Sequence, residues 1–271
     1  MYESYWNLNS RPFCGGSDSD FFFAGSSAES TLQRLTYALE NLSGPVLIPG
    51  ETGTGKTTLV RRFAQEFGEF QPFVQLLFPM LSADESLRML LRELTGAELN
   101  GIPARDTVLS GICSALKNIA ASGSKALLFF DDAHLYSEDT LLQILHPLLC
   151  MEEADRSNSL RIILAGQPAL VERISRVTPV SERIAVCSPL SPLSRNETAE
   201  FITASLAASG QTAPIFTEPS IDRLFRATEG NMRKIARLSE MALLVGFAEQ
   251  QEEIDADVID SVAAEILPAA A

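Results

Sequence analysis

The stretch "GETGTGKTTLV", residues 50–60, has the spacing of a phosphate-binding loop. Gly50, four intervening residues and then Gly55-Lys56-Thr57 satisfy the pattern G-x-x-x-x-G-K-[ST]. The glycines allow a tight backbone turn whose N–H groups point inward at phosphate oxygens. We therefore expect the phosphates of a nucleotide to bind along nine consecutive residues: Gly50, Glu51, Thr52, Gly53, Thr54, Gly55, Lys56, Thr57 and Thr58.

The side chains of Lys56 and Thr57 provide the chemistry of this loop. The lysine ammonium contacts the β- and γ-phosphates of ATP, and the threonine hydroxyl is a ligand of Mg²⁺. The apolar run "PVLIP", residues 45–49, precedes the loop and is typical of a buried strand. Apolar residues at helical spacing follow it, and such a helix directs its N-terminal N–H groups at the same anion. A chance glycine-rich turn is the alternative, but motif and context agree on the phosphate loop.

A second apolar run, "ALLFFDDAH" at residues 126–134, ends in two aspartates. A phosphate loop needs an acidic partner for Mg²⁺, and that partner comes from the end of a neighbouring buried strand. We expect Asp131 to hold Mg²⁺ through water and Asp132 to act as the base for the attacking water. The alternative is an acidic turn that caps the next helix.

The order of apolar patterns predicts an α/β fold with a mostly parallel sheet covered by helices on both faces. Helical patterns alternate with five strand candidates at residues 45–49, 73–78, 125–130, 160–165 and 184–187. After a hinge at "SPLSPL", residues 188–193, a capping box at Ser194–Glu197 opens an all-helical tail. The predicted domains are therefore an α/β domain at 1–190 and a small helical domain at 191–271.

Composition restricts the function classes. The chain has 271 residues and a formal net charge of −14, which disfavours a broad nucleic-acid footprint because phosphate binding needs a basic face. Basic residues do gather locally near the C-terminus, at Arg223, Arg226, Arg233, Lys234 and Arg237, although a solvated helix face explains most of them. No run of 18 or more apolar residues exists, so no membrane span is expected.

Cysteine usage and the N-terminal sequence favour a cytoplasmic protein. The four cysteines, at positions 14, 113, 150 and 187, have no C-x-x-C spacing and look like free thiols in a reducing compartment. The start of the chain has no basic region followed by an apolar stretch, so we expect no signal peptide. The two histidines, His134 and His146, lie far from any paired ligand pattern, and we expect ordinary core or surface roles for them.

Taken together, the phosphate loop, the strand ending in Asp-Asp-Ala-His and the helical tail resemble the AAA+ ATPases. Within them the chain is similar to the general secretion pathway protein A (ExeA-type) group and to the transposition ATP-binding proteins. The segments that carry this resemblance are "YWNLNSRPF", "FFFAGSSAESTLQRLTYAL" near the adenine, "ILAGQPAL", "SERIAVCSPLSPLS" and "TEGNMRKI". The likeness covers nearly the whole chain, and its Gly-Gln-Pro and lid motifs are more specific than the loop.

The resemblance implies roles for three further residues. Gln167 takes the position of sensor 1, a polar group that contacts the γ-phosphate or the attacking water. Arg233 takes the position of the lid arginine, sensor 2. Arg183 precedes the last strand, where such proteins often carry an arginine finger for the neighbouring subunit, and Arg176 competes for that role. An arginine that stabilises transition-state charge is a recurring part of this chemistry.

The chain also departs from the pattern that it resembles. Met232 stands where the family usually has proline, and Asp132 stands where it usually has glutamate, which puts the hydrolysis rate in doubt. The related secretion proteins often continue into a membrane span and a peptidoglycan-binding domain. This sequence ends at Ala271, so we do not expect those functions here.

Two functions follow from these observations. The first is a cytoplasmic ATPase with ATP and Mg²⁺ as cofactors, which self-associates in a nucleotide-dependent manner and remodels or assembles an unidentified protein partner, such as one in envelope or secretion machinery. The second is an ATP-dependent switch on DNA with slow hydrolysis, as in the transposition regulators. The basic lid residues favour the second function, and the net charge favours the first.

Overall fold

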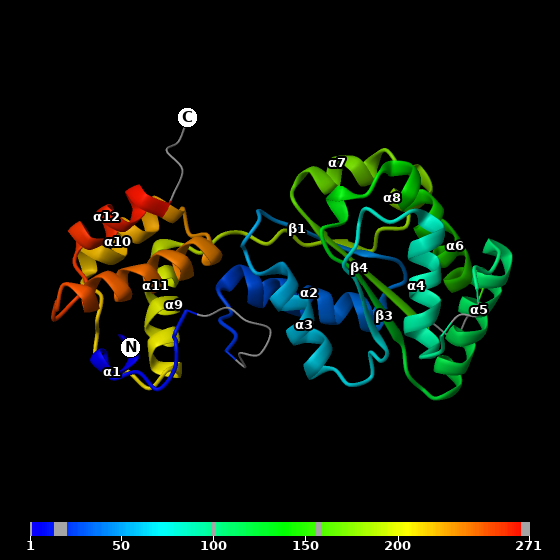
Figure 1. The fold of residues 1–271 in the computed structure, drawn as a ribbon. Helices are drawn as coiled ribbons and strands as arrows, with labels where there is room; N and C mark the ends of the chain where they lie inside the picture. Colours follow the sequence, from blue (N-terminus) through cyan, green and yellow to red (C-terminus); the bar gives the residue numbers. More distant parts are fainter. Residues whose placement is uncertain (1, 14–20, 99–100, 155–158, 267–271) are drawn as a thin grey trace. The chain divides into compact units, whose positions relative to one another are not determined.

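The computed structural model describes residues 2–13, 21–98, 101–154 and 159–266 (Figure 1). The chain divides into two compact units, each with its own apolar core. The first, here called the sheet unit, comprises residues 28–51 and 56–190. The second, here called the helical unit, comprises the described parts of residues 1–27, 52–55 and 191–271. No helix among the described residues is both long enough and apolar enough to cross a membrane.

Five parallel strands form the centre of the sheet unit. Their order across the sheet is β2-β3-β4-β1-β5, and every neighbouring pair runs parallel. The strands are β1 (Val46–Pro49), β2 (Phe73–Leu76), β3 (Ala126–Phe130), β4 (Leu160–Gly166) and β5 (Val186–Cys187). The predicted parallel α/β fold is thus confirmed, with β2 ending two residues before, and β5 beginning two residues after, the predicted bounds.

Helices cover both faces of this sheet (Figure 1). They are α2 (Ser26–Asn41), α3 (Lys56–Glu66), α4 (Ala83–Thr95), α5 (Arg105–Ala121), α6 (Glu138–Ala154), α7 (Ala169–Ser175) and α8 (Thr178–Ser181), together with the 3₁₀ turn η1 (Ala133–Leu135). The sequence did not predict α7 and α8, because seven and four residues are too few to show a helical period.

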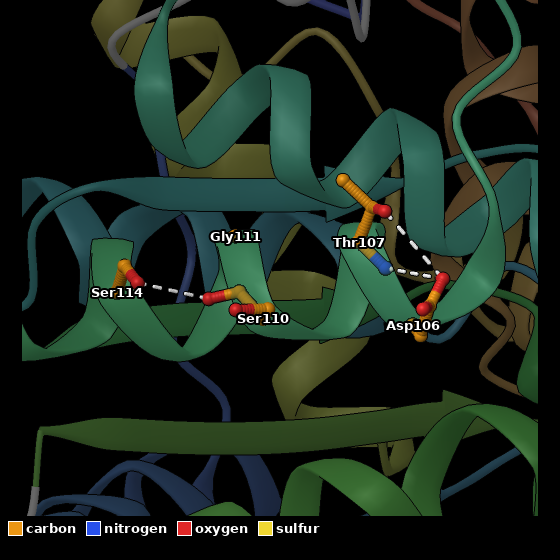
Figure 2. A pocket seen from close by; sticks show the side chains of 5 residues that line it. All are labelled: Asp106, Thr107, Ser110, Gly111 and Ser114. Atoms are coloured by element: carbon orange, nitrogen blue, oxygen red, sulfur yellow. Dashed lines mark hydrogen bonds between the residues drawn. The ribbon is translucent and has the colours of Figure 1, made fainter.

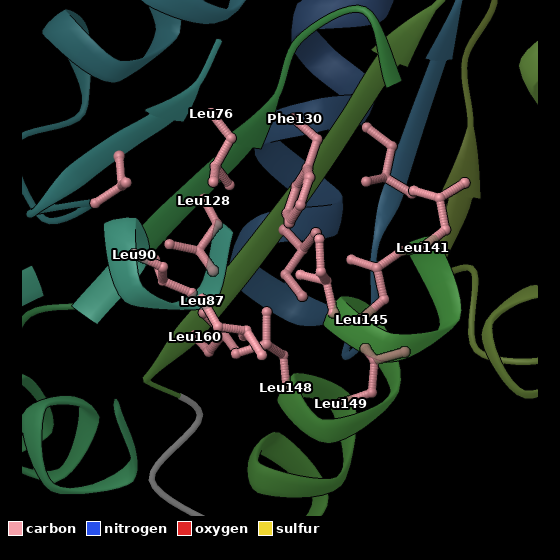
Figure 3. Close-up of a cluster of buried hydrophobic side chains, with 14 of the residues drawn as sticks. Leu76, Leu87, Leu90, Leu128, Phe130, Leu141, Leu145, Leu148, Leu149 and Leu160 are labelled. Atoms are coloured by element: carbon pink, nitrogen blue, oxygen red, sulfur yellow. The ribbon is translucent and has the colours of Figure 1, made fainter. Parts of the chain in front are cut away.

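Alternation of side chains along β3 decides which of them face helices α4 and α6. Figure 3 shows Leu128 and Phe130 of β3 in one apolar cluster with leucines of α4 and α6. Since successive side chains on a strand point to opposite faces, Leu127 and Phe129 point away from this cluster. All four side chains are fully buried, as expected for a parallel sheet with both faces covered.

Arg161 of β4 interrupts this apolar pattern and is fully buried. Its guanidinium donates hydrogen bonds to the carbonyl oxygens of Leu39 on α2 and Leu160, and it pairs with the Glu152 carboxylate of α6 at 3.5 Å. Glu152 also accepts from the N–H of Gly44 at 3.4 Å. Burial raises the pKa of the Glu152 carboxyl, while the guanidinium opposes that rise. This buried pair therefore connects the central strand to helices α2 and α6.

Four long helices and one short N-terminal helix lie in the described part of the helical unit. They are α9 (Arg195–Ala208), α10 (Glu218–Thr228), α11 (Met232–Ala248) and α12 (Ala256–Ile266), preceded at the chain start by α1 (Tyr2–Tyr5). The predicted capping box between Ser194 and Glu197 is present, and the described tail has only an isolated bridge between Phe216 and Ile254. The predicted helical tail is thus observed.

The N-terminal segment packs on these helices. Trp6 is buried and donates its indole N–H to the carbonyl of Leu243 on α11 at 3.0 Å. Tyr2 and Phe13 belong to the same apolar cluster as α9–α12. The sequence grouped residues 1–13 with the α/β domain, because the aromatic run itself carries no signal of its packing partner. The predicted boundary between functional domains at 190/191 stays a prediction.

The buried pair allows a test of stability. Arg161→Met should lower the free energy of unfolding by about 3–5 kcal/mol, because it leaves the Glu152 carboxylate buried without its cation. Burial already raises the pKa of Glu152 above its ordinary value of 4.5, and loss of the guanidinium raises it further. The loss of unfolding free energy caused by Arg161→Met should therefore become smaller as the pH falls and the Glu152 carboxyl takes up a proton. Urea unfolding at pH 8 and pH 5 measures both effects.

Two variants make this test specific. Arg161→Met combined with Glu152→Gln should recover much of the loss, since no charge is left buried. Arg176→Met is the matched control, because Arg176 is 59% exposed and forms surface ion pairs with Glu172 and Glu138, so it should change unfolding little. A loss for Arg161→Met no larger than that of the control would contradict the proposed role of the buried pair.

Candidate functional site

The phosphate loop leaves the end of β1 and is anchored to the neighbouring strand. The N–H of Gly50 donates to the carbonyl of Gly166, at the end of β4, at 3.0 Å. Lys56 is the first residue of α3, and its ammonium donates to the carbonyls of Gly50 at 2.7 Å and Glu51 at 2.8 Å. The lysine is 7% exposed, so the side chain lies across the loop and holds its charge there. Thr57 and Thr58 follow in the first turn of α3, where backbone N–H groups lack helical acceptors.

The tip of the loop requires glycine at two positions. Gly53 and Gly55 have φ values of +86° and +92°, which side chains rarely allow. A Cβ atom on Gly53 would also lie 2.4 Å from the side-chain oxygen of Asn231 and 2.9 Å from Cβ of Arg233. A substitution here therefore meets both backbone strain and a steric clash.

The same tip residues contact the start of α11 within the helical unit. The Asn231 amide donates to the carbonyl of Thr52 at 2.6 Å, and the N–H of Arg233 donates to the carbonyl of Gly53 at 3.3 Å. Thr54 is buried, whereas Glu51 and Thr52 are exposed. Arg233, which was predicted as the lid arginine, is thereby placed beside the tip of the phosphate loop.

Asp131 lies directly after β3, and two donors converge on one of its oxygens. Thr57 Oγ1 donates to Asp131 Oδ2 at 2.8 Å, and the side-chain amide of Gln75 on β2 donates to the same oxygen at 3.1 Å. The N–H of Asp132 donates to the other oxygen, Oδ1, at 3.0 Å. The structure thus brings together Thr57 and Asp131, the two residues predicted as metal ligands.

Asp132 has a different environment from its neighbour. Its backbone is left-handed, with φ +47° and ψ +38°, and its side chain is 61% exposed. The nearest titratable partner is His134, whose Nδ1 lies 3.9 Å from Asp132 Oδ1, beyond hydrogen-bond distance. Burial lowers the pKa of the His134 imidazole, so the ring is neutral at pH 7. The Asp132 carboxylate is therefore largely open to solvent.

Gln167 follows β4, the strand between β1 and β3 in the sheet. Because parallel strands end at the same edge, it is presented between the phosphate loop and Asp131. Its backbone carbonyl accepts from the N–H of Leu170 at 2.9 Å, which closes the turn into α7. The sheet order thus brings Gln167 to the same edge of the sheet as the phosphate loop and Asp131.

The two candidate finger arginines, Arg183 and Arg176, both form ion pairs with carboxylates of their own chain. The carbonyl of Arg183 packs against Gly44, before the amino end of β1, whereas the loop follows the carboxyl end. The Arg183 guanidinium donates to the Glu153 carboxylate at 2.5 Å and to the carbonyl of Pro179 at 2.6 Å. Arg176 pairs with carboxylates of its own. The structure therefore does not choose between them.

Gln75 is the site residue that the sequence analysis missed. It is the one polar residue in "FVQLLF", residues 73–78, and a single polar residue in an edge strand has many ordinary explanations. Only the register of β2 against β3, which pairs Gln75 with Phe129 two residues before Asp131, brings its amide to the aspartate.

The atoms that Thr57 and Asp131 offer to a metal are hard oxygen ligands, which suit Mg²⁺. Among the described residues, no group of three or more His, Cys, Asp or Glu side chains could hold a metal by itself. Mg²⁺ is commonly bound by one or two protein ligands together with substrate phosphates and water, and Thr57 and Asp131 would supply such ligands.

A separate hollow of about 490 Å³ lies along α5 (Figure 2). It is lined by Asp106, Thr107, Ser110, Gly111 and Ser114. Asp106 accepts from the N–H of Thr107 at 2.8 Å, and the Ser114 hydroxyl donates to the carbonyl of Ser110 at 2.9 Å. These polar groups are engaged within the helix, so the hollow offers no evident chemistry.

Comparisons with known proteins agree with this geometry. Residues 40–174 match a protein family described as AAA domain. General secretion pathway protein A of Aeromonas hydrophila is 27% identical over 263 residues, which make up 94% of this chain and 46% of that protein. The chain thus spans about half the length of this curated relative.

Two solved structures illustrate the same fold. The ORC2 protein of Aeropyrum pernix, in its ADPNP–ADP complexes, aligns with 95% of this chain and 72% of its own, with a TM-score of 0.70 and 16% identity. Cdc6p of Pyrobaculum aerophilum aligns with 96% of this chain and 72% of its own, with a TM-score of 0.73 and 16% identity. At this identity the likeness concerns the fold. Residues 40–174 thus form an AAA domain, the fold is that of the AAA+ P-loop NTPases, and the sequence is similar to that of general secretion pathway protein A.

Proposed function

We propose that this protein binds ATP with Mg²⁺ and hydrolyses it to ADP and phosphate, and that the cycle remodels or assembles a partner protein complex. The observation that carries the proposal is the hydrogen bond between Thr57 and Asp131, because it joins the phosphate loop to the acidic end of β3. The match to the AAA domain family supports ATPase activity in general. The specific roles below are proposals for this chain.

In this proposal the loop residues 50–58 hold the phosphates through backbone N–H groups and the Lys56 ammonium. The ammonium already lies across the loop, so it needs little rearrangement to contact the β- and γ-phosphates. Thr57 and Asp131 would hold Mg²⁺, directly and through water. The metal neutralises charge on the β- and γ-oxygens. Residues 1–190 would carry this site, and residues 191–271 would serve as the lid.

Asp132 would accept the proton of the attacking water. Its side chain is exposed and has no hydrogen-bonded partner among the interactions described above, so it is available to a water molecule. Aspartate is one methylene shorter than the usual glutamate, and displacement of a catalytic group by about 1 Å can cost on the order of 100-fold in rate. Gln167 would contact the γ-phosphate or orient the water. The proposed enzyme therefore binds ATP well and turns over slowly.

Self-association would complete the site. Arg183 or Arg176 would contact the nucleotide of a neighbouring subunit, since an arginine acting between subunits supplies positive charge to the transition state. The similarity to general secretion pathway protein A supports an envelope- or secretion-related partner. Arg233, beside the loop tip, would sense the γ-phosphate and report it to the lid helix.

One observation favours a second candidate function, a nucleotide-dependent switch on DNA. Five basic residues are exposed on α10 and α11, namely Arg223, Arg226, Arg233, Lys234 and Arg237. Such a group can contact phosphates locally even in an acidic chain. ATP-dependent DNA binding that weakens steeply with salt would favour this second candidate over the first.

Lys56→Ala should weaken ATP binding by on the order of 100-fold, because charge-assisted hydrogen bonds contribute about 1.5–3 kcal/mol each and the loop loses its ammonium. Titration with a fluorescent ATP analogue measures the affinity. Lys117→Ala, which removes an exposed lysine of α5, is the matched control and should bind like the wild type. Equal affinity for both variants would exclude residues 50–58 as the nucleotide site.

Asp132→Glu should raise the turnover rate, since the longer side chain brings the carboxylate closer to the water. Asp132→Asn should nearly abolish turnover while ATP stays bound, because an amide cannot take the proton. Steady-state phosphate release, measured beside ATP affinity, separates the two effects. If Asp132→Asn turned over like the wild type, Asp132 would not be the base and Gln167 would be the better candidate for placing the water.

Alanine substitution of the finger arginine should lower ATPase activity by about 10³-fold or more and leave nucleotide affinity unchanged. Arg183→Ala and Arg176→Ala are compared directly, each alone and mixed with Lys56→Ala subunits. Mixing should rescue activity for the true finger, because one subunit supplies the arginine and the other an intact loop. If neither variant were rescued, a site shared between subunits would be wrong.

A further inference from the structure

A chain of hydrogen bonds runs from Arg61 on α3 through Gln75 on β2 to Asp131 at the end of β3. Arg61 Nε of α3 donates to Gln75 Oε1 at 3.0 Å. Gln75 Nε2 then donates to Asp131 Oδ2 at 3.1 Å. Thr57 donates to that same oxygen at 2.8 Å. Helix α3, strand β2 and the end of β3 thus meet at one carboxylate oxygen.

The partners of Gln75 determine which way its amide faces. A guanidinium only donates hydrogen bonds, and an ionised carboxylate only accepts them. The amide oxygen must therefore face Arg61, and the amide nitrogen must face Asp131. The reversed amide would place two donors together on one side and two acceptors together on the other. Arg61 consequently acts on Asp131 through Gln75, although it has no direct contact with the aspartate among the described interactions.

Helix and strand periodicities explain why these side chains converge. Thr57 and Arg61 are four residues apart on α3, so they lie on the same face of the helix. On β2, Val74 and Leu76 are buried in the cluster with α4 and α5, and Gln75 therefore points to the opposite face. One face of α3 thus presents both the loop threonine and the arginine that orients Gln75.

We propose that Gln75, oriented by Arg61, is a positioning residue that fixes the Asp131 carboxylate beside Thr57 for Mg²⁺. This inference rests on the proposed function, because it concerns the metal that accompanies ATP. With both donors present, Oδ2 is held from two directions and Oδ1 by the N–H of Asp132. Without Gln75, Thr57 alone restrains Oδ2, and the carboxylate is held less firmly in its orientation. Groups that orient a metal ligand in this way commonly contribute 10–100-fold to metal affinity.

The test is a Mg²⁺ titration of nucleotide binding by the full chain. Gln75→Leu has similar size and cannot donate or accept hydrogen bonds. It should raise the Mg²⁺ concentration needed for half-maximal tightening of fluorescent ATP-analogue binding by about 10-fold or more. Affinity for the analogue in EDTA should be unchanged, because the phosphate loop is intact. A general loss of structure would weaken both affinities together.

Substitution of Arg61 provides an independent test of the same proposal. Arg61→Met should shift the Mg²⁺ midpoint in the same direction, because the amide loses the partner that fixes its orientation. The double variant with Gln75→Leu should be no worse than Gln75→Leu alone, as expected for residues that act in series. Arg62→Ala is the matched control, since Arg62 is the next residue of α3 and pairs with Glu66 at 2.7 Å on the surface.

The possible outcomes separate this inference from the proposed function. If the wild type bound no ATP analogue, or bound it without any effect of Mg²⁺, the proposed function would fail, and with it the metal that the inference concerns. If the wild type responded to Mg²⁺ and Gln75→Leu had the same midpoint, only the positioning role would be overturned. Additive effects of Gln75→Leu and Arg61→Met would overturn the series arrangement.

Discussion

Parallel pairing of β1, β4 and β3 is the constraint on which the candidate site depends. All three strands end at one edge of the sheet, so the phosphate loop, Gln167 and Asp131 emerge side by side. The hydrogen bond from Thr57 to Asp131 connects the residues that follow β1 and β3 across the end of the intervening strand β4. An antiparallel neighbour would carry its polar end to the opposite edge, and the loop would then have no acidic partner.

Two polar residues within strands show how differently such positions are used. Gln75 points to the α3 face of the sheet and reaches the candidate site. Arg161 lies near the start of β4 and connects that strand to α2 and α6 through backbone carbonyls and Glu152. The first residue orients a ligand of the proposed metal, and the second stabilises the packing that holds the strands. Both lie in otherwise apolar strands, and only their partners distinguish them.

The environments of the two aspartates fit a division of roles. Asp131 is buried and receives three hydrogen bonds, so its orientation is fixed before any ligand binds. Asp132 is exposed on a left-handed turn and keeps rotational freedom. If Asp131 is the metal ligand and Asp132 the base, as proposed, a preorganised ligand beside a less constrained base would favour binding and assembly over fast turnover. If Arg183 is the finger, its ion pair with Glu153 would add a further step, since the arginine would have to leave that carboxylate before it acted on a neighbour.

The sequence by itself determined the class of fold and the chemistry of the loop. Gly50, Lys56 and Thr57 have the residue types and the spacing that phosphate binding requires, and "ALLFFDD" can be recognised because a buried strand that ends in carboxylates is unusual. The tertiary structure alone decided which distant residues serve the site. Gln75 and Arg61 belong to it because of strand register and helix phase, and Gly53 is required partly because Asn231 packs against it. Residues 2–13 pack on α9–α12, which no local pattern indicates. Local propensity and motif spacing act along the chain, whereas these contacts depend on packing between segments that are far apart in sequence.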